Sequence, residues 1–234
     1  KSFGGGGMEE LTMQEPLNNI IRETLVALGA ILGGVQGVGL CCYDEAYTIP
    51  TPEAQLISLR TFQILMEEAG MGDVADPLGG SYYIEQLTVE LEKAAVSLMD
   101  EIEKSGGIVK AIEDGAIQRL QARGAYERQK QIDSVEKVWI GANKYASEGE
   151  EWDVKLHQYD PTIQMRQVEK LNKVKKERDN ARVEKCLKDL KEAAESGANI
   201  MPSTLEAVKA YATIGEMTKV LKSVFGEFKQ PSVF

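Results

Sequence analysis

Two adjacent acidic residues, Asp44 and Glu45, follow a short apolar segment that is rich in glycine, residues 35–40. Enzymes built from alternating strands and helices place their chemistry where parallel strands end, so carboxylates at this point are candidate site residues. A carboxylate there can accept charge-assisted hydrogen bonds from a ligand, or it can complement the dipole of a following helix. The spacing leaves both roles open for Glu45 and favours a structural role in the turn for Asp44.

Three further residues of chemical interest are Gln36, Cys41 and Cys42. A polar side chain in an apolar strand needs a hydrogen-bond partner, and a ligand or a neighbouring strand would serve equally well for Gln36. The only other cysteine is Cys186, and an odd number with two adjacent is not a disulfide framework. We therefore expect the thiols to behave as small hydrophobic groups. We also expect the protein to occupy a reducing, cytoplasmic compartment.

Composition narrows the class of protein. The 234 residues are 43% hydrophobic, which is enough for a core, and the formal net charge of -10 disfavours binding to nucleic acid or an anionic membrane. The longest apolar run, residues 25–32, is far shorter than the roughly 20 residues that span a bilayer.

The single histidine, His157, disfavours His-rich metal sites. The chain begins at Lys1 without a secretory leader, so we expect a cut or processed start.

The hydrophobic spacing predicts a mostly helical chain with few strands. Helices are expected over residues 16–32, 52–70, 81–104, a short stretch before Gly115, 116–132, 162–195 as one helix or a pair, near 203–204, and 214–228. Leu17, Ile21 and Leu25 belong to the face of the first helix that we expect to be buried. Strands are expected at residues 35–40 and 138–141, and Gly4 to Gly7 are expected to be a loop or a site of close backbone approach.

The segment Gln36-Gly-Val-Gly-Leu-Cys-Cys-Tyr-Asp-Glu-Ala-Tyr-Thr-Ile-Pro50 resembles the last barrel strand of the adenosylcobalamin-dependent acyl-CoA mutases, the methylmalonyl-CoA mutase family. Other segments resemble the family in the same order along the chain. They are Leu17-Asn-Asn-Ile-Ile-Arg22, Asp76-Pro-Leu-Gly-Gly-Ser-Tyr-Tyr-Ile-Glu-Gln-Leu-Thr88, Gly106-Gly-Ile-Val-Lys-Ala-Ile112, Ile140-Gly-Ala-Asn-Lys-Tyr145 and Ala212-Thr-Ile-Gly-Glu216. The resemblance covers nearly the whole chain.

The resemblance implies an α/β fold: the C-terminal part of a (β/α)8 TIM barrel, with its last one or two strands, followed by a helical tail. Residues 1–146 would be the barrel portion and residues 147–234 the helical C-terminal extension, with helix predominating by residue count. The implied function is part of the large, substrate-binding subunit of a mutase that isomerises the carbon skeleton of a short-chain acyl-CoA by radical chemistry. The implied partners are a cobalamin-binding small subunit, the remainder of the barrel or large subunit, and the acyl-CoA substrate.

The implied cofactor is adenosylcobalamin, with its cobalt ligand supplied by another domain or subunit because the surroundings of His157 lack the family's Asp-x-His-x-x-Gly spacing. By resemblance, Glu45 would hydrogen-bond the ribose hydroxyls of the adenosyl group, and Gln36 and Cys41 would lie near the same group. No catalytic acid or base and no metal ligand is assigned within the chain.

Cys41 stands where methylmalonyl-CoA mutase has an asparagine, and the pattern around it is more similar to the isobutyryl-CoA and 2-hydroxyisobutyryl-CoA mutase branch. The substrate therefore need not be methylmalonyl-CoA. The alternative function is a non-catalytic subunit that completes a barrel or assists assembly in a split mutase.

Overall fold

The structure is a computed structural model that describes residues 2–147 and 152–231. The chain divides into two compact units: the first comprises Lys1–Gln158 with Pro231–Phe234, and the second comprises Tyr159–Gln230. The glycine and acidic residues between positions 147 and 153 predict a linker there, and part of it lies outside the described residues. The assignment of residues 1–146 and 147–234 to two parts of a mutase stays a prediction.

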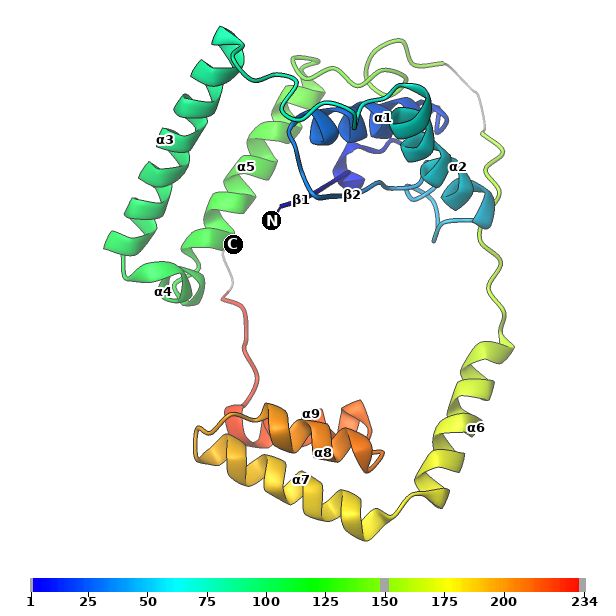
Figure 1. The fold of residues 1–234 in the computed structure, drawn as a ribbon, viewed down its shortest axis with the longest axis vertical. Coiled ribbons are helices and arrows are strands. Elements are labelled where there is room, and N and C mark those ends of the chain that lie inside the picture. Colours follow the sequence, from blue (N-terminus) through cyan, green and yellow to red (C-terminus); the bar gives the residue numbers. More distant parts are fainter. Residues whose placement is uncertain (1, 148–151, 232–234) are drawn as a thin grey trace. The chain divides into compact units, whose positions relative to one another are not determined.

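The first unit begins with a βαβ arrangement, shown in blue in Figure 1. Strand β1 (Phe3–Gly5) pairs in parallel with β2 (Gly37–Gly39), and helix α1 (Asn18–Leu32) connects them after a short 3-10 helix η1 (Met8–Glu10). Helix α2 (Pro52–Gln63) follows, packs against α1 and continues as a π-helix η2 (Ile64–Glu68). The order β-α-β-α with a parallel pair is that of an α/β protein.

The prediction of a loop at Gly4 to Gly7 is wrong for Gly4 and Gly5, which belong to β1, and is confirmed for Gly6 and Gly7, which belong to no helix or strand. The second alternative, close backbone approach, is confirmed. A Cβ atom at Gly5 would lie 2.8 Å from the carbonyl oxygen of Gly39 on the paired strand. Glycine is therefore required where the strands meet, and this outweighs its unfavourable backbone entropy. Strand β2 occupies only the centre of the predicted segment 35–40.

The face of α1 that is buried differs from the predicted one. Asn19, Glu23 and Ala27, spaced four residues apart, are buried, whereas Leu17, Ile21 and Leu25 are exposed. Residues four apart share one side of a helix, so this side packs on the two-stranded sheet and the turn that follows it. The apolar periodicity correctly predicted the helix but not the side that faces the rest of this unit.

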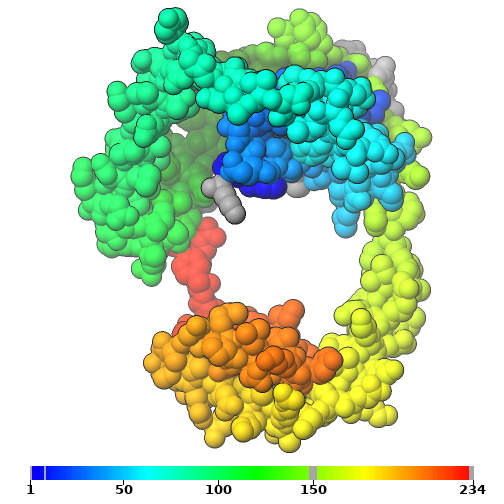
Figure 2. All heavy atoms as spheres, viewed as in Figure 1, coloured from blue at the N-terminus to red at the C-terminus, as the bar shows by residue number. Residues whose placement is uncertain are grey.

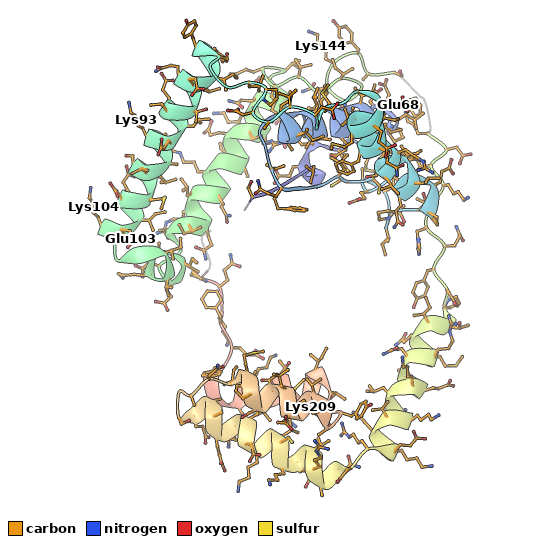
Figure 3. The ribbon with its side chains drawn as sticks, viewed as in Figure 1. Glu68, Lys93, Glu103, Lys104, Lys144 and Lys209 are labelled. Atoms are coloured by element: carbon orange, nitrogen blue, oxygen red, sulfur yellow. The ribbon has the colours of Figure 1, made fainter. Side chains whose placement is uncertain are left out.

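Three successive helices follow in the first unit, in agreement with prediction: α3 (Tyr82–Lys104), α4 (Gly107–Glu113) and α5 (Ala116–Asp133). Helix α4 contacts both α3 and α5. Gly106 and Gly115, with φ values of 109° and 73°, take the left-handed conformation that the two turns require. Along α3, Lys93, Glu103 and Lys104 are exposed (Figure 3).

The strand predicted at residues 138–141 is absent from the described residues, which contain only an isolated bridge between Ile140 and Lys144 there. The side chain of Asn143 explains the difference. Its Oδ1 accepts a hydrogen bond from the Trp139 amide at 2.6 Å, and its Nδ2 donates to the carbonyl of Lys137 at 2.8 Å. A local side chain thus satisfies the backbone and closes it into a turn.

The second unit contains α6 (Thr162–Glu177), α7 (Asn180–Glu195), α8 (Met201–Lys209) and α9 (Ile214–Phe225), which confirms the predicted helices in this region. Helix α7 packs against α8 and α9, and the close packing of α7 with α8 is seen in Figure 2 in yellow and orange. Val183, Cys186, Ala207 and Ala210 form the centre of this small core. Within residues 2–147 and 152–231, none of the helices is both long and apolar enough to cross a membrane.

Candidate functional site

The turn after β2, residues 40–45, carries two of the three predicted site residues, Cys41 and Glu45. The Cys42 amide donates a hydrogen bond of 2.6 Å to Glu45 Oε1, and the Glu45 amide donates one of 3.0 Å to the Cys42 carbonyl. The Glu45 carboxylate thus binds the amide three residues earlier, as the acid of a capping box does, and the return bond is accepted by the Cys42 carbonyl. The acid at position 45 has a local structural role at the start of a turn, and its side chain remains only half-buried.

Asp44 has the structural position predicted for it. Its side chain is fully buried, and its Oδ2 accepts hydrogen bonds from the Thr51 amide at 2.9 Å and the Thr51 hydroxyl at 2.8 Å. Thr51 is in turn the N-cap of α2, where its hydroxyl oxygen accepts a hydrogen bond from the Ala54 amide. Asp44 therefore fixes the start of α2 through the cap residue.

A second carboxylate, which the sequence reasoning missed, reaches the same turn from α1. Glu23 is only 3% exposed, and its Oε2 accepts a hydrogen bond of 2.9 Å from the Cys41 amide. Its Oε1 is buried and has no hydrogen-bond partner among the described residues. A Cβ atom at Gly6 would overlap this carboxylate. The signal that could have identified Glu23 is its spacing of four residues from the polar Asn19.

Asn19 holds the turn one helical turn before Glu23. Its Nδ2 donates hydrogen bonds to the carbonyls of Thr12, at 2.9 Å, and Tyr43, at 3.0 Å. Arg22 donates to Asn19 Oδ1 at 2.7 Å and to the Ile140 carbonyl at 2.7 Å. The buried polar side of α1 therefore binds the backbone of the turn at two points: Asn19 binds the Tyr43 carbonyl, and Glu23 binds the Cys41 amide.

The site has a negative electrostatic character that keeps its thiols neutral. Burial, followed by the charges of Glu45 and Glu23, raises the pKa of the Cys41 thiol to about 11. Burial and the charges of Glu45 and Asp44 raise the pKa of the Cys42 thiol to about 12. Burial also raises the pKa of Glu23, an effect opposed by its hydrogen bond from the Cys41 amide and reinforced by Glu45.

Gln36, the third predicted site residue, precedes β2, whereas Cys41 and Glu45 follow it. Its Oε1 accepts a hydrogen bond of 2.7 Å from the Ser2 amide, so the neighbouring chain segment supplies its partner. Gln36 also lines a cavity of about 520 Å³, together with apolar residues such as Val38 and Phe62. The structure brings Cys41 and Glu45 together and leaves Gln36 at the other end of the strand.

This arrangement can accept hydrogen bonds from hydroxyl groups but offers little for proton transfer. Carboxylates provide the acceptors, and the thiols of Cys41 and Cys42 remain protonated near neutral pH. The site lies where two parallel strands end, with Gly6 continuing the ladder through a bond of 2.9 Å from its amide to the Gly39 carbonyl. Chemistry at the C-terminal ends of parallel strands is the usual arrangement in α/β enzymes.

The family model described as methylmalonyl-CoA mutase matches residues 3–227. The chain is 42% identical over 225 residues to the 2-hydroxyisobutanoyl-CoA mutase large subunit of Aquincola tertiaricarbonis, covering 96% of this chain and 40% of that protein. It is also 42% identical over 220 residues to the mitochondrial methylmalonyl-CoA mutase of Homo sapiens, covering 94% of this chain and 29% of that protein.

A more distant relative, the methylmalonyl-CoA mutase of Escherichia coli (strain K12), is 35% identical over 222 residues, covering 95% of this chain and 31% of that protein. The chain thus spans 29–40% of the length of these relatives. All of these relatives are mutases, which are isomerases. With a family match over residues 3–227 and identity of this extent, the chain belongs to the methylmalonyl-CoA mutase family.

Proposed function

We propose that this chain is part of the large, substrate-binding subunit of an adenosylcobalamin-dependent acyl-CoA mutase. The observation that carries the proposal is the family match, which covers almost the whole chain at 42% identity to a mutase large subunit. In this proposal, residues 1–146 are the C-terminal portion of a (β/α)8 barrel and residues 147–234 are a helical extension.

The parallel βαβ unit supports the barrel part of the proposal. A strand, a helix, a second parallel strand and a further helix are what two successive units of such a barrel contribute. The apolar side of α1, with Leu17, Ile21 and Leu25 exposed, is available to pack against neighbouring helices of a larger fold. Two strands of three residues each are too small a sheet to bury that side alone.

The carboxylate oxygens of the turn are hydrogen-bond acceptors, which is what the ribose hydroxyls of an adenosyl group require. Glu45 Oε1 is used by the Cys42 amide, so a ribose hydroxyl would be bound mainly by the second oxygen, Oε2. Each charge-assisted hydrogen bond of this kind contributes roughly 1.5–3 kcal/mol. Cys41 would lie beside the same group as a neutral thiol. Gln36 would contact the ligand only if the ligand extended past the start of β2.

When bound, adenosylcobalamin would supply the radical chemistry of the isomerisation, with its cobalt held by another domain or by a small subunit. The residues of this chain would orient the ribose and exclude water from it. The acyl-CoA would be methylmalonyl-, isobutyryl- or 2-hydroxyisobutyryl-CoA. The three cysteines are free, which supports a reducing, cytoplasmic compartment.

The test is to purify the native complex that contains this chain and to assay isomerisation of the three acyl-CoA thioesters with and without adenosylcobalamin. Glu45→Gln is the informative variant and should lower adenosylcobalamin affinity and turnover. Glu68→Gln is the matched control, because Glu68 is an exposed acid on η2 that has no place in the site (Figure 3).

Turnover of any of the three thioesters that depends on adenosylcobalamin and weakens in Glu45→Gln supports the proposal. A complex that assembles but isomerises none of them would instead favour the second function, a non-catalytic subunit that completes a barrel. Equal turnover in wild type and Glu45→Gln would remove the role proposed for Glu45.

A further inference from the structure

Glu23 belongs to α1 and not to the turn of residues 40–45, yet its carboxylate binds the backbone of that turn. We infer that Glu23 is a positioning residue, which holds this turn in the conformation that presents Glu45, and that Gly6 is glycine because it makes room for Glu23. The inference rests on the proposed adenosyl-binding function of Glu45.

Two carboxylates fix two consecutive amides of the turn. Glu23 Oε2 accepts the hydrogen bond of the Cys41 amide at 2.9 Å, and Glu45 Oε1 accepts that of the Cys42 amide at 2.6 Å. Since the backbone has only two soft dihedral angles per residue, holding both amides restrains the backbone between them. The contact from α1 therefore fixes the point from which the Glu45 side chain starts.

Gly6 joins this cluster from β1. Its amide donates to the Gly39 carbonyl at 2.9 Å, and its carbonyl accepts a hydrogen bond of 3.5 Å from the Cys41 thiol. A side chain at position 6 would overlap the Glu23 carboxylate, so the two residues form a size-matched pair. The end of β1, the helix and the turn after β2 thus meet at one carboxylate.

A buried carboxylate at position 23 is unfavourable for the stability of the fold. Glu23 is a buried residue whose Oε1 has no partner among the described residues, and such an unpaired group is energetically unfavourable. The charges of Glu45 and Glu10 also act against ionisation of Glu23. An apolar side chain would pack here without these costs, and a buried acid beside a second acid is a feature of functional sites.

The experiment uses the assembled mutase with Glu23→Ala, Glu23→Gln and Glu23→Asp, together with Gly6→Ala and the double variant Gly6→Ala/Glu23→Ala. The first measurement compares affinity for adenosylcobalamin with affinity for hydroxocobalamin, which lacks the adenosyl group. The second is hydrogen exchange of the Cys41 and Cys42 amides. Glu68→Gln again serves as the control.

We expect Glu23→Ala to weaken adenosylcobalamin binding roughly tenfold, the size of one lost charge-assisted hydrogen bond, and to leave hydroxocobalamin binding unchanged. Glu23→Gln keeps an acceptor for the Cys41 amide and should restore most of the affinity, whereas the shorter Glu23→Asp should not. Gly6→Ala should weaken binding in the wild-type background and have a smaller effect when Glu23 is also alanine.

The outcomes separate this inference from the proposed function. If Glu45→Gln weakens adenosylcobalamin binding but Glu23→Ala changes neither binding nor amide exchange, the positioning role is overturned and the proposed function stands. If the wild type does not prefer adenosylcobalamin over hydroxocobalamin, the proposed function fails. Amide exchange then tests the positioning role by itself: faster exchange in Glu23→Ala supports that role, and unchanged exchange overturns it. If Glu23→Ala does not fold, the comparison of Glu23→Gln with Glu23→Asp decides.

Discussion

Arg178, in the turn between α6 and α7, and Glu216, in the first turn of α9, are joined by two parallel hydrogen bonds. Nη1 lies 2.8 Å from Oε2 and Nη2 lies 2.6 Å from Oε1, and the Arg178 side chain is only 7% exposed. Nη1 also donates to the Tyr211 carbonyl at 2.8 Å. Glu216 completes a capping box with Thr213, so a single carboxylate serves both the ion pair and the helix start.

Breaking this pair should destabilise the second unit. Glu216→Gln leaves the largely buried guanidinium of Arg178 without its countercharge, and we expect a loss of about 1–3 kcal/mol. The measurement is the free energy of opening of α9 from amide hydrogen exchange in the whole chain. Glu206→Gln is the control, because the ion pairs of Glu206, with Arg182 at 3.8 Å and with Lys209 at 2.7 Å, are exposed, and their loss should change α9 little. Equal effects of the two variants would contradict the prediction.

The same pair should make the second unit sensitive to acid. The hydrogen bond from Arg178 lowers the pKa of Glu216 from its ordinary value of 4.5 to about 2, against the opposing effect of burial. Because this pKa is lower in the folded state than in the unfolded chain, the stabilisation is complete above pH 4.5 and is lost as the pH falls towards 2. Protection factors of α9 amides should therefore fall over this range in wild type. Glu216→Gln should show a smaller fall, and equal falls would argue against this origin.

Asp44 and Glu45 should respond differently to substitution although they are adjacent. Asp44→Ala removes the acceptor of the buried Thr51 amide and should destabilise the first unit by about 1–3 kcal/mol, measured by urea unfolding of the chain. Thr51→Ala removes the α2 cap and the hydroxyl's hydrogen bond to Asp44 but keeps the bond from the Thr51 amide, and should cost about 1–2 kcal/mol. Glu45→Gln should leave stability nearly unchanged and act on coenzyme affinity. Similar unfolding curves for Asp44→Ala and Glu45→Gln would contradict this division.

The helices could be predicted within a few residues because caps and glycines mark their ends. The helix expected over residues 52–70 begins at Pro52 in the structure, with Thr51 as its N-cap. The glycine run could not reveal β1, because a strand of Phe3–Gly5 depends on close contact with β2 and not on its own propensity. A local side chain determines the structure of residues 138–141, where Asn143 closes a turn that an apolar run does not predict.

The site was predictable where local spacing defines it and not where the fold assembles it. Asp44 and Glu45 come a few residues after the predicted strand 35–40, so the sequence indicated carboxylates in the turn that follows it. Glu23 precedes Glu45 by 22 residues in the sequence. Only the packing of α1 on the turn brings the Glu23 carboxylate close to that turn. The sequence predicted burial of the leucine and isoleucine side of this helix, whereas the buried side in this unit is the one that carries Asn19 and Glu23.

The thiols of Cys41 and Cys42 should react slowly with iodoacetamide, since the thiolate is the reactive form. The pKa of Cys41 rises from its ordinary value of 9.0 to about 11, mainly through burial and then through the charge of Glu45. At pH 8 this shift lowers the thiolate population roughly a hundredfold, so Cys41 in the folded chain should be alkylated at least that much more slowly than in urea. Peptide mass spectrometry measures both rates. Glu45→Gln removes one negative charge and should accelerate labelling of the folded protein, whereas Glu68→Gln should not. Labelling of Cys41 at the same rate with and without urea would show that the thiol is neither buried nor held neutral.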